Sequence, residues 1–123
     1  MKIIVIEPHP TVLMLATDAL TIALGKDLAI VTAPQFTGSQ KIVSKHLDAD
    51  MAFVAYDAPT GRGGKIAQEL KSMAPHLKVI LTSTVAGPET AERLGLDGFL
   101  PKENFFPPAE LKRFIDLHLA QAA

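Results

Sequence analysis

Short hydrophobic runs recur along the whole chain, separated by longer amphipathic stretches. Residues 3–6 form an unbroken aliphatic run, and comparable runs occupy residues 28–33, 51–56, 77–81 and 98–100. Short apolar runs without polar alternation are typical of strands that are buried on both faces of a parallel sheet. The pattern therefore predicts five parallel strands.

Each run is followed by a stretch whose apolar residues have helical spacing. These stretches are residues 11–24, a segment around Ile42, Val43 and Leu47, and residues 65–73, 88–94 and 108–119. Gly25 suits a helix C-cap, Pro88 a first helical turn, and Thr37 or Ser39 an N-cap. Strands that alternate with helices pair in parallel through right-handed crossovers. We therefore predict an α/β, flavodoxin-like three-layer sandwich, with a five-stranded parallel sheet of order 2-1-3-4-5 and helices on both faces.

Composition and charge limit the classes of function. With 123 residues, 48% of them hydrophobic, residues 1–123 are expected to form one domain, either alone or as the N-terminal part of a longer protein. A net charge of −1 gives no reason to expect binding to nucleic acid or to membranes. The absence of cysteine excludes disulfides and thiolate chemistry. Because neither a signal peptide nor a membrane-spanning segment is recognisable, we expect a cytoplasmic protein.

The ends of the predicted strands carry motifs through which the sequence resembles the receiver domain of bacterial response regulators, the CheY-like superfamily. The segment IIVIEPHP at 3–10 is similar to the family's first strand, DMAFV at 50–54 to its third and GFLPK at 98–102 to its fifth. Pro59 and Gly63 match the loop that follows the family's phosphorylation site. The motifs occur in the family's order and cover essentially the whole chain.

The resemblance implies a specific phosphorylation chemistry. In the family, a carboxylate on the third strand accepts the phosphoryl group and holds Mg²⁺ together with two acids of the first strand. A hydroxyl after the fourth strand and a lysine after the fifth bind the phosphoryl oxygens. Matching by motif and spacing places Ser83 at the hydroxyl, Thr84 at a neighbouring position that the family keeps small, and Lys102 at the lysine.

Two positions of this site lack the groups that the chemistry needs. The acceptor position falls on Ala55, and Pro8 replaces the second acid of the first strand, which leaves Glu7 alone. Since the number and charge of oxygen ligands set the affinity for Mg²⁺, we expect no catalytic, cofactor or metal site and weak or absent Mg²⁺ binding. An engineered change from aspartate is a second explanation for Ala55, but the additional loss at Pro8 favours natural degeneration.

Lys102 and Asp57 each allow two interpretations. Lys102 is expected either to pair with Glu7, which avoids leaving a partly buried charge alone, or to be solvated. Asp57 is an alternative acceptor, displaced from Ala55 by about 6–7 Å at the usual rise of a strand. Phosphoryl transfer depends on accurate positioning, so a turn-forming role in this Gly- and Pro-rich loop is favoured for Asp57.

Gly61-Arg62-Gly63-Gly64-Lys65 suggests a rival function, a flavodoxin-like module that binds phosphate or nucleotides. Backbone N–H groups at a helix start can hold an anion. The complete phosphate-loop motif needs a hydroxyl residue after the lysine, and Ile66 stands there instead. Ordinary turn chemistry is therefore the favoured role of this loop.

The apolar stripe of the last helix is wider than one core-facing helix needs. Together with neighbouring aromatic residues, it predicts a surface for a protein partner or for self-association on the face built from residues 88–94, 98–100 and 108–119. Core packing is the alternative, and Phe99 also matches the family's aromatic switch position. The residues of this predicted face are Phe99, Phe105, Phe106, Leu111, Phe114 and Ile115. The sequence thus predicts a non-enzymatic, atypical receiver that acts in signal transduction through phosphorylation-independent protein contacts.

Overall fold

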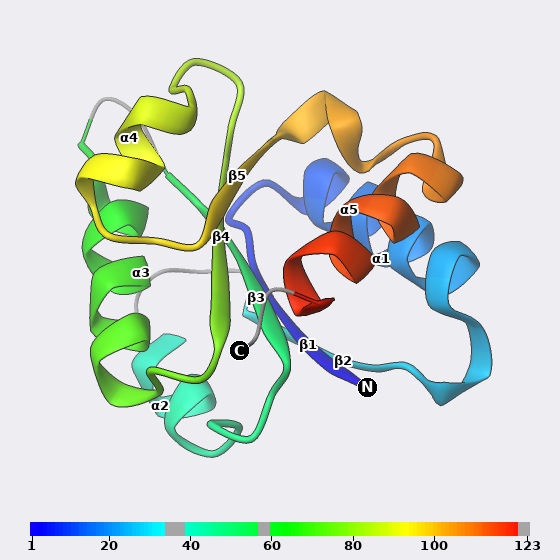
Figure 1. The fold of residues 1–123 in the computed structure, drawn as a ribbon, viewed down its shortest axis with the longest axis horizontal. Coiled ribbons are helices and arrows are strands. Elements are labelled where there is room, and N and C mark those ends of the chain that lie inside the picture. Colours follow the sequence, from blue (N-terminus) through cyan, green and yellow to red (C-terminus); the bar gives the residue numbers. More distant parts are fainter. Residues whose placement is uncertain (34–38, 57–59, 121–123) are drawn as a thin grey trace.

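A computed structural model describes residues 1–33, 39–56 and 60–120 and has the predicted α/β architecture (Figure 1). The strands are β1 (Lys2–Ile6), β2 (Ala29–Ala33), β3 (Met51–Ala55), β4 (Lys78–Ser83) and β5 (Gly98–Pro101). They form one parallel sheet in the order β2-β1-β3-β4-β5. The predicted fold class and strand order are confirmed.

Helices cover both faces of the sheet. They are α1 (Pro10–Leu24), α2 (Ser39–Ser44), α3 (Arg62–Met73), α4 (Pro88–Arg93) and α5 (Pro108–Ala120), with short 3₁₀ helices η1 (Gly25–Asp27) and η2 (Lys102–Phe105). Figure 1 shows α1 and α5 on one side of the sheet and α2, α3 and α4 on the other. Among the described residues, none of these helices has the length and apolar character that crossing a bilayer requires.

The buried strands explain the unbroken hydrophobic runs of the sequence. Ile3 and Phe53 belong to a core that packs against α1 and α5, whereas Ile4 and Val54 belong to a second core beneath α2 and α3. Successive side chains of a strand point to opposite faces, so the central strands need apolar residues at every position. The sheet is therefore the middle layer between two cores.

Two helices differ from their predicted bounds by more than one residue. The helix predicted to carry Ile42, Val43 and Leu47 ends at Ser44, so Leu47 lies beyond it. The start of α3 also differs. This helix begins at Arg62, three residues before the predicted start at residue 65. Gly61 adopts the left-handed conformation, with φ of 68°, and ends the preceding loop, so that Gly63 and Gly64 fall within the first helical turn. The glycines that indicated a loop in the sequence are therefore part of a helix.

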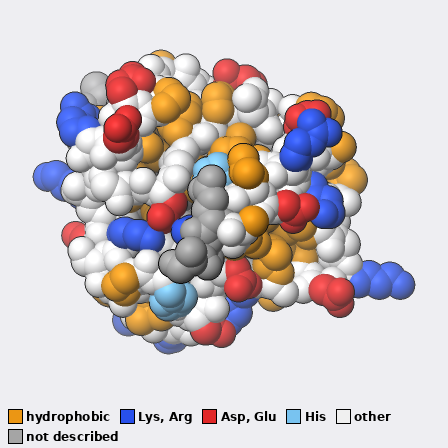
Figure 2. Space-filling view, in the orientation of Figure 1, with side chains coloured by type: hydrophobic (Ala, Val, Ile, Leu, Met, Phe, Trp, Pro, Cys, Tyr) orange, Lys and Arg blue, Asp and Glu red, His pale blue; other side chains and the backbone are white. Residues whose placement is uncertain are grey.

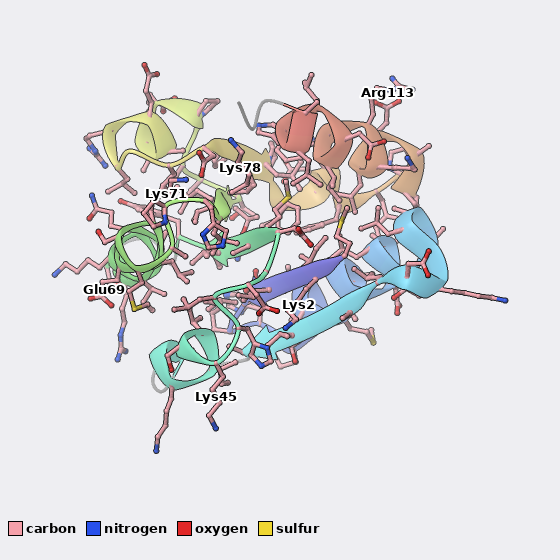
Figure 3. The ribbon with its side chains drawn as sticks, turned by 60° about the horizontal axis from the view of Figure 1, so that its bottom comes forward. Lys2, Lys45, Glu69, Lys71, Lys78 and Arg113 are labelled. Carbon is pink, nitrogen blue, oxygen red and sulfur yellow. The ribbon has the colours of Figure 1, made fainter. Side chains whose placement is uncertain are left out.

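Polar side chains form contacts at the end of the sheet where the parallel strands begin (Figure 3). Lys71 of α3 forms an ion pair with Asp97 at 2.8 Å and donates hydrogen bonds to the carbonyls of Pro75 and Leu77. Asp97 in turn accepts a hydrogen bond from the backbone of Val79 in β4. All these groups are used for structure, because they connect the end of α3 to the start of β4.

Lys2 at the same edge provides a test of local electrostatics. Its Nζ donates to both carboxylate oxygens of Asp48, at 2.9 and 3.0 Å, and this hydrogen bond lowers the pKa of Asp48 below the ordinary value of 3.8. A depressed carboxyl pKa contributes stability that is present above the unfolded value and is lost as the pH falls through the folded value. The contribution is small and salt-sensitive, because the Asp48 side chain is 71% exposed.

We predict that NMR titration of the Asp48 carboxyl carbon gives a midpoint below 3.8, and that Lys2→Met returns the midpoint toward this value. An unchanged Asp48 titration in Lys2→Met would contradict the assignment.

Candidate functional site

The predicted site residues lie together at the end of the sheet where four of its parallel strands have their carboxyl ends. The register pairs Ala55 with Thr82 across β3 and β4, and Ser83 with Pro101 across β4 and β5. Pro8 follows β1 and is half-buried. The predicted residues at this edge are Glu7 after β1, Ala55 at the end of β3, Ser83 at the end of β4 and Lys102 after β5.

Glu7 and Lys102 form a buried ion pair at the centre of this site. Lys102 Nζ lies 2.9 Å from Glu7 Oε1 and 3.2 Å from Oε2, and only 12% and 4% of the two side chains are exposed. Glu7 Oε2 also accepts a hydrogen bond from the backbone N–H of His9, the N-cap residue of α1. The expected pairing of Lys102 with Glu7 is therefore present, and the lysine is not solvated.

Ala55 is fully buried and has a helix packed directly against its backbone. A Cβ atom at Gly63 would overlap the carbonyl oxygen of Ala55 and lie 2.7 Å from its carbonyl carbon. Gly63 also donates its backbone N–H to the carbonyl of Tyr56 at 3.1 Å. The first turn of α3 thus lies against the end of β3, and Ala55, the predicted acceptor position, carries a buried methyl group without a nucleophilic atom.

The hydroxyl at the fourth strand is held by its own loop. Ser83 is 5% exposed, and its Oγ accepts hydrogen bonds from the backbone N–H groups of Val85 and Ala86 at 3.1 and 2.9 Å. Thr84 is exposed, whereas Thr82 is buried beside the site. In this structure the Ser83 hydroxyl therefore stabilises the turn between β4 and α4.

The alternative acceptor, Asp57, lies outside the described residues, so its role stays a prediction. Among residues 1–33, 39–56 and 60–120, no cluster of three His, Asp or Glu side chains is suitable for binding a metal ion. Glu7 is occupied by Lys102 and the His9 N–H in this structure. The expectation of weak or absent Mg²⁺ binding likewise stays a prediction.

The glycine-rich segment has a packing explanation that sequence reasoning missed. Gly63 lies against the backbone of Ala55, and a Cβ at Gly64 would lie 3.1 Å from Leu94 and 3.2 Å from Tyr56. Two consecutive glycines after a strand therefore permit close packing of helix on sheet. The nucleotide-binding alternative is not needed to explain them.

The predicted partner face divides into buried and accessible residues. Phe105, Leu111 and Ile115 are at most 3% exposed and belong to the core between the sheet and α1 and α5. Phe105 packs edge-on against Phe53, with ring centroids 5.4 Å apart. Assigning these three residues to a partner surface was wrong, because a stripe counted along one helix does not show which neighbours cover it.

Phe106 and Phe114 line a groove between η2 and α5, together with Leu117, another residue of the apolar stripe predicted on the last helix. The groove has a volume of about 420 Å³. Phe106 is 42% and Leu117 59% exposed, whereas Phe114 and Phe99 are half-buried. Phe99 is not among the groove residues. Successive side chains of a strand point to opposite faces of the sheet, and Leu100 faces α5, so Phe99 points to the other face.

One ion pair borders this groove. Arg113 and Glu110, both of which line it, form an ion pair at 3.3 Å. The side of the molecule that holds α5 shows hydrophobic side chains next to positive and negative ones (Figure 2). An apolar groove with a polar border is the usual composition of a protein-binding surface.

Comparison with known proteins identifies the fold. Neither a family model nor a curated protein sequence matches the chain. It is similar to a response regulator receiver domain from Clostridium thermocellum, with a TM-score of 0.80, 22% identity and coverage of 98% of this chain and 94% of that one. It is also similar to a CheY-like receiver domain from Methanospirillum hungatei, with a TM-score of 0.78, 16% identity and coverage of 98% of this chain and 94% of that one.

A third similar structure is the BeF3-activated receiver domain of DrrB, a Thermotoga maritima response regulator, with a TM-score of 0.74, 20% identity and coverage of 98% and 97%. At these identities the likeness establishes the CheY-like receiver fold and nothing finer.

Proposed function

We propose that this domain is an atypical receiver, which transmits signals by binding a protein partner and does not accept a phosphoryl group. The observation that carries the proposal is the buried methyl group of Ala55 at the acceptor position of a receiver fold. Alanine offers no atom that could attack phosphorus. The proposal therefore rests on the chemistry of one side chain in a known fold.

The surroundings of Ala55 support the same conclusion. In the family, the lysine after the fifth strand pairs with the phosphoryl group; here Lys102 is held by Glu7 at 2.9 Å in a nearly dry environment. Freeing Lys102 would leave a buried carboxylate without its partner, which is energetically costly. A phosphate ion entering this site would have to compete with that ion pair.

The groove between η2 and α5 is the surface that we assign to the partner. A receiver that is not switched by phosphate changes state only if another molecule binds one state better. The groove offers exposed Phe106 and Leu117 beside the Arg113–Glu110 pair. We infer a protein segment that inserts one apolar side chain between these residues and meets the charges at the border.

The proposal predicts that phosphate analogues leave the domain unchanged. Titration of the ¹⁵N-labelled domain with beryllium fluoride and Mg²⁺ is expected to produce no saturable shifts at the amides of Ala55, Ser83 and Lys102. The DrrB receiver domain, which is known in a BeF3-activated form, is the positive control. The physical reason is that BeF₃⁻ mimics phosphate only when a carboxylate oxygen coordinates beryllium.

Saturable shifts around these amides would contradict the proposal and point to the displaced acceptor. In that case, the same titration of Asp57→Asn decides whether Asp57 is the group that binds. Mass spectrometry after treatment with acetyl phosphate gives an independent readout, in which the proposal expects no added phosphoryl mass.

A further inference from the structure

A second groove lies between α2 and α3, which are neighbours on the same face of the sheet (Figures 1 and 3). Its volume is about 910 Å³, compared with about 420 Å³ for the groove between η2 and α5, and the two grooves share no lining residue. We call it the α2–α3 groove. Its lining includes Lys41 and Ser44 of α2 and Lys65, Gln68, Glu69 and Met73 of α3.

The character of the α2–α3 groove changes along its length. Lys65, Glu69 and Met73 follow one another at intervals of four residues, so they form one stripe along α3. Because α2 and α3 each follow a strand of a parallel sheet, the two helices run in the same direction. Lys41 is the third residue of α2 and Lys65 the fourth of α3, so both lysines lie toward the same end. The groove is therefore cationic at one end, acidic in the middle and apolar at the other end.

The lysines of the cationic end have no acidic partner among the described residues. Lys41 and Lys65 are exposed and form no ion pair there, and the same holds for Lys45, which directly follows α2. Other lysines of the domain each pair with a carboxylate, namely Lys2, Lys71, Lys102 and Lys112. The whole chain has a net charge of −1, so this end of the groove has the opposite sign and attracts an anionic group.

We propose that the α2–α3 groove binds an acidic segment of a partner protein in an extended conformation. A carboxylate of the segment meets Lys41 and Lys65, and an apolar side chain covers Met73, which is 44% exposed. The eight residues from Lys65 to Met73 span about 12 Å of helix. An extended segment covers that distance with about four residues, so its acidic and apolar residues are three or four positions apart.

Glu69 favours such a segment over a nucleic acid or an anionic membrane. Those two carry negative charges at short intervals, so a stretch that fills the groove places charges beside Glu69 as well as beside the lysines. Like charges brought together in this way weaken binding. A protein segment avoids the repulsion, because it places its carboxylate at one end of the groove and an uncharged residue opposite Glu69.

Selection from a random heptapeptide library displayed on phage tests the proposal, with the 123-residue domain as the target. Counter-selection with the double variant Lys41→Glu, Lys65→Glu removes peptides that bind elsewhere. The enriched peptides are expected to carry an aspartate or glutamate three or four positions from a leucine, isoleucine, methionine or phenylalanine. Failure to enrich any peptide, or enrichment of peptides without an acidic residue, overturns the proposal.

A fluorescent synthetic copy of the most enriched peptide then gives the dissociation constant for each variant. Lys41→Glu and Lys65→Glu are each expected to raise it at least about fivefold, because each replaces an attraction with a repulsion. Met73→Gln is expected to raise it at least about threefold, because the apolar contact is lost. These side chains are exposed, so the fold is expected to persist, and circular dichroism checks this.

Lys26→Glu is the matched control for the lysine variants. Lys26 is an exposed lysine of η1, on the other side of the sheet, and it also forms no ion pair among the described residues. Its reversal should change the dissociation constant by less than about twofold, since the net charge changes but the groove does not. Equal weakening by Lys26→Glu and Lys65→Glu would mean unspecific attraction and overturn the proposal.

NMR titration of the ¹⁵N-labelled domain with the same peptide locates the binding site. Saturable shifts are expected at the amides of Ser44 and Gln68, and shifts confined to the groove between η2 and α5 contradict the proposal. A single-stranded thymidine oligonucleotide and phosphatidylserine vesicles are the alternative anionic probes. If either binds more tightly than the peptide and loses affinity in Lys65→Glu, the groove recognises that polyanion and the proposal is wrong.

Discussion

Replacing Gly63 with alanine is expected to lower the free energy of unfolding by more than about 3 kcal/mol, beyond the usual range for overpacking. The added methyl group would overlap the carbonyl oxygen of Ala55 and approach the carbonyl carbon of Tyr56 to 3.1 Å. Both contacts are with backbone atoms, of Ala55 at the end of the fully buried strand β3 and of Tyr56 directly after it, so no flexible side chain can move aside. Either α3 moves away from the sheet or the end of β3 shifts.

Chemical denaturation followed by circular dichroism measures this loss, and Gly64→Ala is the matched control. Gly64 is the next residue in the same helical turn, but its added methyl group would meet the tips of Leu94 and Tyr56 at 3.1–3.2 Å. Alanine also favours a helix over glycine by about 1 kcal/mol, which offsets such contacts. Gly64→Ala should therefore stay within about 1 kcal/mol of wild type. Equal losses in the two variants would refute the packing explanation for Gly63.

These glycines show what the sequence can and cannot predict about the fold. Hydrophobic periodicity located the strands, and the order of the sheet followed from the parallel α/β pattern. The predicted start of α3 was residue 65, because Gly63 and Gly64 are poor helix formers and were assigned to the preceding loop. Their role depends on the distance between a helix and a strand, and a single sequence contains no signal for that distance beyond two adjacent glycines.

The site was predicted more completely than the partner surface. Family motifs placed Glu7, Ala55 and Lys102 at the carboxyl ends of the first, third and fifth strands, and these ends lie at the same end of the sheet because the strands are parallel. Partner residues are defined by exposure, which depends on the neighbours of each side chain. Phe105 and Phe106 are adjacent in sequence, yet the first packs against Phe53 and the second is 42% exposed. No periodic pattern separates two such neighbours where a 3₁₀ helix ends.

Removing Lys102 is the second change with a large expected effect. Lys102→Met should destabilise the domain by about 3–5 kcal/mol, because the substitution leaves the carboxylate of Glu7 buried without its cation. Glu7→Gln in the Lys102→Met background should recover much of this loss, since a neutral amide beside an apolar side chain carries no unpaired charge. Denaturant unfolding of both single variants and the double variant gives the coupling between the residues.

The exposed ion pair of α5 provides the comparison for this double-mutant cycle of Glu7 and Lys102. Lys112 and Asp116 are both 53% exposed, so Lys112→Met is expected to cost less than about 1 kcal/mol. Strict additivity of Glu7→Gln and Lys102→Met would show that the two charges do not stabilise each other, contrary to their 2.9 Å separation. A large coupling would mean that Lys102, which the sequence matches to the family's phosphate-binding lysine, stabilises the fold through Glu7 in the absence of phosphate. Under the proposed function, the absence of a carboxylate at Ala55 and the presence of Lys102 then have one explanation, because Glu7 supplies the negative charge that Lys102 requires.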